Sequence, residues 1–138
     1  GSAAIGPFIR LFDGNFTLQT VESLRVGLQI KGADGFLLQD HSDMGQISRP
    51  PAEIVAQTLN RSHQYPDGFV LYLGTMFAPT KDRDAPGQGF THHRGDRVII
   101  SSGPLGMLAN TVQPCDEIAP WTFGTRALLE NLARRGVL

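Results

Sequence analysis

Residues 23–31 alternate strictly between apolar and polar side chains, and this pattern constrains the fold more than any other feature of the chain. The apolar positions are Leu24, Val26, Leu28 and Ile30. Because successive side chains of a β-strand point to opposite faces, the pattern predicts a strand with one buried and one wet face. Residues 32–35 supply a hairpin turn, and residues 36–39 are the expected partner strand.

Two more apolar-rich runs, residues 96–101 and 105–112, flank a turn at residues 102–104 and predict a second hairpin. Residues 69–73 form a short aromatic and aliphatic run with a glycine on each side, the second being Gly74. We expect a strand buried on both faces there.

Two helices are expected at the periphery of this sheet. The first begins near Pro51, because proline suits the first helical turn and Glu53 complements the helix dipole. Its apolar stripe should pack on the sheet. The second covers about residues 125–135, ends at Gly136, and is expected to form a C-terminal lid. Residues 1–138 therefore predict one strand-rich α+β domain.

Composition narrows the classes of partner. The chain has 12 basic and 13 acidic residues, and no basic stripe that would bind a phosphate backbone, so nucleic acid is not expected. Cys115 is the single cysteine, which excludes an internal disulfide and a cysteine-based zinc cluster and indicates an intracellular protein. No apolar run approaches the roughly 18 residues that span a bilayer. We expect a cytoplasmic protein without a membrane partner.

Residues 76–95 form a connection of about twenty residues between expected strands, against a usual median of about 4–6. Met76, Phe77 and Phe90 offer apolar anchors, and four prolines and glycines restrict or bend the segment. Disordered segments tend to lack this combination, so we expect an ordered, functional loop.

Two groups of charged or titratable residues in this loop are candidates for binding chemistry. Asp82, Arg83 and Asp84 place two carboxylates around a guanidinium, which could hold a substrate or form a solvated, mutually paired turn. His92 and His93 are adjacent, and adjacent side chains of an extended segment point to opposite faces, so they are not expected to share a metal ion.

A second group of candidates precedes the first expected helix. His41, Ser42 and Asp43 have the residue types of a hydrolytic triad, but neighbours in sequence cannot adopt its geometry, and turn or capping hydrogen bonds are expected instead. Arg49 lies beside a helix N-terminus, where anions are favoured, and could hold a carboxylate. The equally weighted alternative is a surface arginine.

Three segments carry a resemblance to a known family: residues 42–49 (Ser-Asp-Met-Gly-Gln-Ile-Ser-Arg), 65–68 (Tyr-Pro-Asp-Gly) and 73–79 (Leu-Gly-Thr-Met-Phe-Ala-Pro). The chain resembles the fumarylacetoacetate hydrolase superfamily, and within it is most similar to the C-terminal part of the 2-keto-3-deoxy-D-xylonate and D-arabinonate dehydratases. Residues 82–84, 86–92, 120–124 and 131–133 extend this resemblance over nearly the whole chain.

The resemblance implies mixed β-sheets rolled around a cavity, a magnesium ion, and a 2-keto-3-deoxy acid substrate that loses water by β-elimination to give 2-oxoglutarate semialdehyde. Gly74 and Thr75 match the glycine-threonine pair that meets the substrate carboxylate in this family. Arg49, Met76 and Ser42, which lie in the matching segments, complete the expected substrate-binding set.

One departure from the family concerns the metal. The family holds its metal with a Glu-x-Glu pair and an aspartate located before the segment that matches residues 5–7, and no Glu-x-Glu occurs here. We therefore expect the magnesium ligands upstream, this chain to be the C-terminal portion of a longer, homo-oligomeric enzyme, and the chain alone to be inactive. The alternatives are a β-diketone or acylpyruvate C–C hydrolase of the same superfamily and a non-catalytic oligomerisation or anion-binding module.

Overall fold

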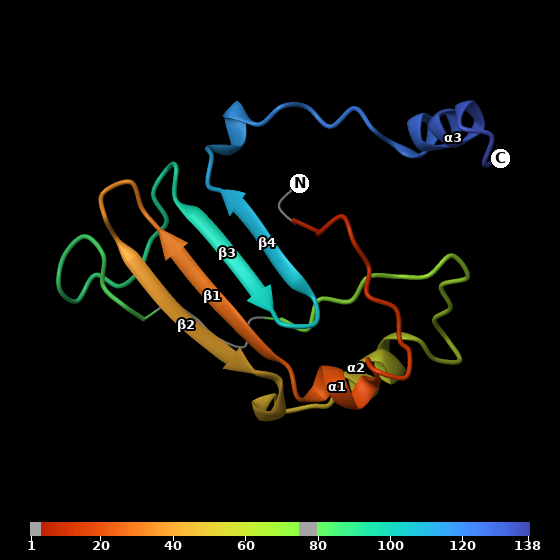
Figure 1. The fold of residues 1–138 in the computed structure, drawn as a ribbon, viewed down its shortest axis with the longest axis horizontal. Helices are drawn as coiled ribbons and strands as arrows, with labels where there is room; N and C mark the ends of the chain where they lie inside the picture. Colours follow the sequence, from red (N-terminus) through yellow and green to blue (C-terminus); the bar gives the residue numbers. More distant parts are fainter. Residues whose placement is uncertain (1–3, 75–79) are drawn as a thin grey trace.

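The computed structural model describes residues 4–74 and 80–138. At its centre is a four-stranded antiparallel sheet in the order β2-β1-β3-β4, which confirms the expected strand-rich α+β fold (Figure 1). The strands are β1 (Arg25–Lys31), β2 (Leu37–Asp43), β3 (Arg97–Ser102) and β4 (Gly106–Thr111). The helices are α1 (Leu18–Glu22), α2 (Pro51–Thr58) and α3 (Thr125–Arg134), with 3-10 turns at Met44–Gln46 and Cys115–Glu117.

The hairpin of β1 and β2 confirms the prediction from the alternating pattern. Ile30 pairs with Leu38, and the turn closes with Gly35 at a φ of 83°, a backbone conformation that favours glycine. β2 continues to Asp43, four residues beyond the expected partner strand, because the pairing follows β1 back to Arg25. His41 and Ser42 therefore lie in a strand rather than a turn, whereas Asp43 makes the expected capping bond: its Oδ1 accepts the amide of Gly45 at 2.9 Å.

The second hairpin, β3 and β4, also forms as predicted. Its place in the sheet was not predictable from local pattern: β3 pairs with β1, from Lys31 opposite Arg97 to Gly27 opposite Ser101. The β1–β2 turn and the start of β3 therefore lie at one end of the sheet, and the β3–β4 turn lies at the opposite end.

Buried apolar side chains gather along β1 and at its two ends. Ile30 and Leu38 are buried near the β1–β2 turn, and Leu24 is buried just before β1 with Phe16 and Met44. Between these groups the apolar face is open, since Ile100 on β3 is 45% exposed. Apolar side chains are therefore buried at both ends of β1, and the middle of this face is open.

The helices lie away from the faces of the sheet. Figure 1 shows α1 and α2 together beyond the end that carries the β3–β4 turn, so the expectation that α2 packs on the sheet is wrong. No residue of α3 is buried, and the helix stands apart from the sheet at the end of an extended segment, so it is not a lid. α1 was missed by pattern, although Thr17 and Thr20 form a capping box at its start.

Residues 69–74 form no strand, which contradicts the strand expected at residues 69–73. Val70 and Tyr72 are exposed rather than buried on both faces. β1 is already paired on both sides by β2 and β3, and within the described residues the run does not pair with an outer edge of the sheet either. Within the described residues, no helix is long and apolar enough to cross a membrane.

Candidate functional site

A surface hollow of about 370 Å³ joins Arg49 to the segment that precedes Gly74. Its lining residues come from the approach to α2, from α2 itself and from one position of the 69–74 segment: Ile47, Ser48, Arg49, Ile54, Gln57, Thr58 and Leu73. The structure thus brings together two of the segments that carry the expected substrate-binding residues, even though the strand expected at residues 69–73 does not form.

The remaining expected site residues are placed differently. Gly74 follows Leu73 directly, is exposed and has a φ of 86°, so its backbone is open to solvent. Thr75 and Met76 lie outside the described residues. Ser42 is on β2 opposite Val26, and it does not line the hollow. Ser42 is therefore not brought together with Arg49.

The charge in this hollow comes from Arg49. Its guanidinium forms no ion pair with any described carboxylate, and it lies next to Pro50, the N-terminal cap of α2. Pro50 provides no side-chain cap, and its carbonyl accepts the amides of Glu53 and Ile54. An unpaired guanidinium beside the positive end of a helix dipole is suited to binding a carboxylate.

A second polar cluster, which we call the Arg83 cluster, lies at the β1–β2 turn and consists of Asp34, Arg83, Asp96 and the imidazoles of His92 and His93. The Arg83 side chain is 2% exposed and that of Asp96 is 1% exposed. Two guanidinium nitrogens bond the Asp96 carboxylate: Nη2 lies 2.8 Å from Oδ1, and Nη1 contacts Oδ2. Nε and Nη2 also reach Asp34, at 3.1–3.3 Å.

The electrostatics of this cluster favour full ionisation. The hydrogen bonds from Arg83 lower the pKa of Asp96 from 3.8 to about 2, against the opposing effect of burial. The pKa of Arg83 is raised, first by its hydrogen bonds to Asp96. The pKa of Asp34 is lowered, first by the amide of Phe36 and then by Arg83. Arg83 and Asp96 therefore form a buried ion pair.

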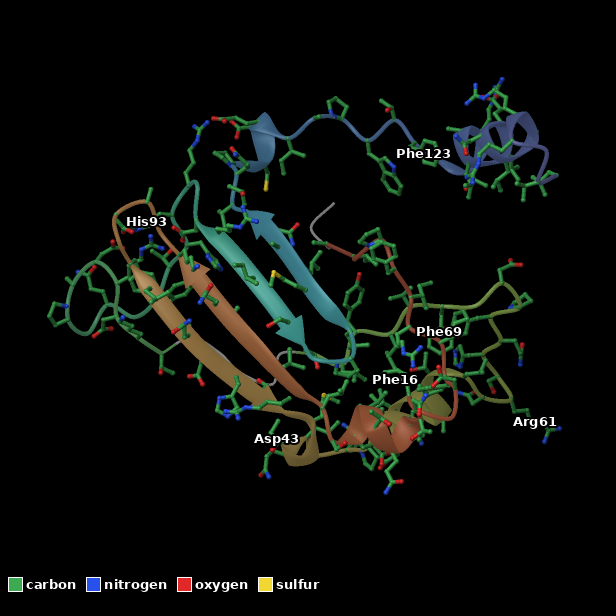
Figure 2. All side chains as sticks on the ribbon, viewed as in Figure 1. Phe16, Asp43, Arg61, Phe69, His93 and Phe123 are labelled. Carbon is green, nitrogen blue, oxygen red and sulfur yellow. The ribbon has the colours of Figure 1, made fainter. Side chains whose placement is uncertain are left out.

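The histidines sit around the same carboxylates. His92 Nδ1 lies 3.6 Å from Asp96 Oδ2, and His93 bridges Asp84 (Nε2 to Oδ1, 2.9 Å) and Asp34 (Nδ1 to Oδ2, 3.6 Å). Figure 2 shows His93 at the β1–β2 turn end of the sheet. The amide of His93 also donates to Asp96 at 2.9 Å, which fixes the turn before β3.

Asp82 does not pair with its neighbour Arg83. Its carboxylate accepts the amides of Gly87 (2.7 Å) and Gly89 (2.6 Å), and these bonds lower the pKa of Asp82. Arg83 also donates its backbone amide to the carbonyl of Gly89 at 3.1 Å. The described part of the long loop is therefore a set of closed turns, in which Asp82 holds the amides of Gly87 and Gly89.

The ring of Phe36 packs against the cations of this cluster. The Arg83 guanidinium lies 4.5 Å from the ring centroid of Phe36, and Lys81 Nζ lies 4.9 Å from the same ring. Phe90 contacts both Phe36 and His92. Cations over an aromatic face are attracted by its quadrupole, so Phe36 holds two loop cations against the β1–β2 turn.

The Arg83 cluster is a structural ion-pair network that fixes the loop to the sheet, and it is not a binding site. The three guanidinium nitrogens already donate to Asp34, Asp96 and the carbonyl of Thr91, which leaves no free donor for a substrate. Neither sequence reading of Asp82, Arg83 and Asp84 anticipated this, because the partners of Arg83 lie 13 and 49 residues away. Only the turn signal at residues 32–35 hinted that this end of the sheet would be fixed.

The resemblance implies a magnesium ion, and the described residues do not supply its site. No three His, Cys, Asp or Glu side chains within residues 4–74 and 80–138 are arranged to hold a metal ion. The two carboxylates of the Arg83 cluster, Asp34 and Asp96, are both bonded by the guanidinium of Arg83.

Comparisons with known proteins do not place the chain in a family. No protein-family model matches it, and neither a curated protein nor a solved structure does.

Proposed function

We propose that this chain is the substrate-binding C-terminal portion of a metal-dependent 2-keto-3-deoxy sugar acid dehydratase, with a fumarylacetoacetate hydrolase-like fold in the complete enzyme. The observation that supports this proposal is the hollow lined by both Arg49 and Leu73, the residue that precedes Gly74 in the chain. Sequence segments 42–49 and 73–79, on which the resemblance depends, border or contain these residues.

Within this proposal the chain's own residues bind and orient the substrate. Arg49 holds the carboxylate of the oxo acid through two parallel charge-assisted hydrogen bonds, and the exposed backbone amide of Gly74 supplies a further donor. Magnesium, when bound through ligands on upstream polypeptide, supplies Lewis-acid activation of the ketone. The described residues contribute no ligand to it.

A titration of the chain itself tests the proposed site. We expect 2-keto-3-deoxy-D-xylonate to shift the amide resonances of Arg49, Leu73 and Gly74 in a ¹⁵N NMR titration. Arg49→Gln should weaken this binding about ten-fold or more, because a hydrogen bond to a charged group contributes about 1.5–3 kcal/mol. Arg61→Gln, at an exposed arginine that does not line the hollow, is the matched control and should leave the affinity unchanged. Shifts that ignore Arg49→Gln would refute the site.

The reaction requires the complete enzyme with magnesium. We expect it to convert 2-keto-3-deoxy pentonates to 2-oxoglutarate semialdehyde, and Thr75→Val to reduce kcat/KM by a factor equivalent to about 1–3 kcal/mol. Cleavage of acylpyruvates without dehydration would instead assign the β-diketone hydrolase activity. Unchanged kinetics of the variant would remove Thr75 from the site.

A second candidate, a non-catalytic oligomerisation module, is favoured by the amount of exposed apolar surface. Phe8 is 90% exposed, and other exposed apolar side chains occur near both chain ends: Ile5, Ile9, Leu11, Trp121, Leu128 and Leu129. Contiguous exposed apolar surface marks an interaction site. Calorimetry with magnesium and a 2-oxo acid separates the candidates, because stoichiometric binding by this chain excludes a purely structural module.

A further inference from the structure

The outer edge of β4 carries backbone groups that no described strand uses. β4 ends the sheet order, so within residues 4–74 and 80–138 only β3 pairs with it. The backbone of Val112 faces β3, since its amide donates to Asp96 and its carbonyl accepts from Gly95. Antiparallel strands alternate between residues that bond the neighbour and residues that face away. By this alternation the residues that face away from β3 are Met107, Ala109 and Thr111.

This edge lacks the features that protect edge strands. Natural sheets commonly shield their edges with charged side chains, proline or a bulge. Gly106–Thr111 contains neither a charged residue nor a proline, and its pairing with β3 is continuous from Arg97 opposite Thr111 to Ser102 opposite Gly106. Met107 is 68% exposed. β4 is therefore a regular, uncharged edge.

The opposite edge, on β2, is protected. The amide of Gly32 donates to the carbonyl of Phe36, so the same alternation turns Leu37 outward. The Leu37 carbonyl accepts from Lys81 Nζ at 2.8 Å, which occupies one outward acceptor. Further along β2, charged or titratable side chains follow at Asp40, His41 and Asp43. Self-pairing of this edge would bring like charges together.

We propose that β4 is a dimerisation edge that pairs antiparallel with β4 of a second copy of this chain. With Ala109 on the two-fold axis, Met107 of each copy faces Thr111 of the other, and the three outward residues form about six backbone hydrogen bonds. The two four-stranded sheets then become one continuous sheet. A second copy suits this edge because it brings no charge to an uncharged strand, and the small Ala109 side chain fits at the axis.

Two neighbouring features agree with this occupant. An apolar hollow of about 210 Å³ lies at the β3–β4 turn and is lined in part by Phe8, Ile100, Leu105 and Met107. Pairing covers Met107 on the rim of this hollow. Because the β2 edge is protected, the described strands of each copy leave one unprotected edge, and pairing through it closes a dimer rather than growing into a fibre.

Sedimentation velocity on the 138-residue chain tests the proposal. We expect a dimer for the wild type and a monomer for Ala109→Lys, which places two ammonium groups across the axis. Gln39→Lys makes the same substitution at an outward position of the β2 edge and should remain dimeric. Circular dichroism checks that each variant is folded. A monomeric wild type, or dissociation by Gln39→Lys instead of Ala109→Lys, would overturn the proposal.

A cross-link keeps the test decisive if Ala109→Lys fails to fold. In a Cys115→Ser background, Ala109→Cys places two cysteines opposite each other at a Cα separation of about 5.5 Å, which a disulfide can bridge. We expect rapid formation of a covalent dimer on mild oxidation, and none for Gln39→Cys. Equal cross-linking at both positions would reduce the contact to random collision. Neither edge contains Arg49 or Gly74, so this result is independent of the proposed oxo acid site.

Discussion

The two ends of the central sheet differ in how their side chains are covered and paired. At the β1–β2 turn, the Arg83 cluster pairs a buried guanidinium with two carboxylates, and an aromatic ring supports it. At the β3–β4 turn, the Ser102 hydroxyl is buried without a hydrogen-bond partner among the described residues, and Phe8 and Met107 remain exposed. One end is closed by its own polar groups, whereas the other keeps apolar side chains exposed although Leu24 is buried nearby.

This difference indicates where the chain is complete in itself and where it is suited to meet another surface. A polar network in which every member has a partner specifies one local structure. An end with exposed apolar side chains and an orphan hydroxyl gains from an added surface. The proposed dimer edge on β4 begins at the β3–β4 turn end, and the Arg83 cluster lies at the β1–β2 turn end.

The largest expected effect comes from removing the buried ion pair of the Arg83 cluster. Arg83→Met should lower the free energy of unfolding by about 3–5 kcal/mol, because it leaves the buried Asp96 carboxylate without its partner. Urea denaturation followed by circular dichroism measures this. The matched control is Arg94→Met, which removes an exposed bidentate pair with Glu117 and should cost less than about 1 kcal/mol. Equal losses would mean that burial does not make the Arg83 pair more important for stability than an exposed pair.

The second expected effect is on acid stability, again at the closed end. The folded-state pKa of Asp96 is lowered from 3.8 to about 2, so the ionised carboxylate stabilises the fold above about pH 4, and this contribution is lost as the pH falls toward 2. Its size is on the order of 2 kcal/mol. As the pH is lowered from about 4 to 2, we expect the free energy of unfolding to decrease less steeply in Asp96→Asn than in the wild type.

The remaining slope in Asp96→Asn should come from other carboxylates with lowered pKa values, including Asp34 and Asp82. Glu130→Gln alters an exposed pair on α3 and should keep the wild-type slope. If Asp96→Asn and the wild type had the same slope, the buried pair would not be ionised as described.

The smallest expected effect tests the open end. Ser102→Ala removes the unpartnered hydroxyl and should be neutral or should stabilise the chain by up to about 1 kcal/mol, since a buried group without a partner carries a desolvation cost. Thermal denaturation of the wild type and Ser102→Ala measures it. A clear loss of stability would show that the hydroxyl has a partner, and would remove this part of the contrast between the two ends.

Local sequence pattern was sufficient for elements that depend on a few consecutive residues. The alternation at residues 23–31 predicted β1, the turns at residues 32–35 and 102–104 predicted both hairpins, and Pro51 and Gly136 marked helix boundaries near where they occur. These rules act through backbone geometry and side-chain periodicity over one or two turns, so no distant partner is needed to satisfy them.

Tertiary structure decided which segments meet. The pairing of β1 with β3, the exclusion of residues 69–73 from the sheet and the bonds from Arg83 to Asp34 and Asp96 each join or separate residues far apart in the sequence. A strand-like run becomes a strand only if the fold brings it to the edge of a partner strand, and a guanidinium becomes buried only if carboxylates reach it. For the same reason the sequence nominated Arg49 and Gly74 as neighbours in function, but only the folded chain placed Arg49 in a common hollow with Leu73 and left Ser42 outside it.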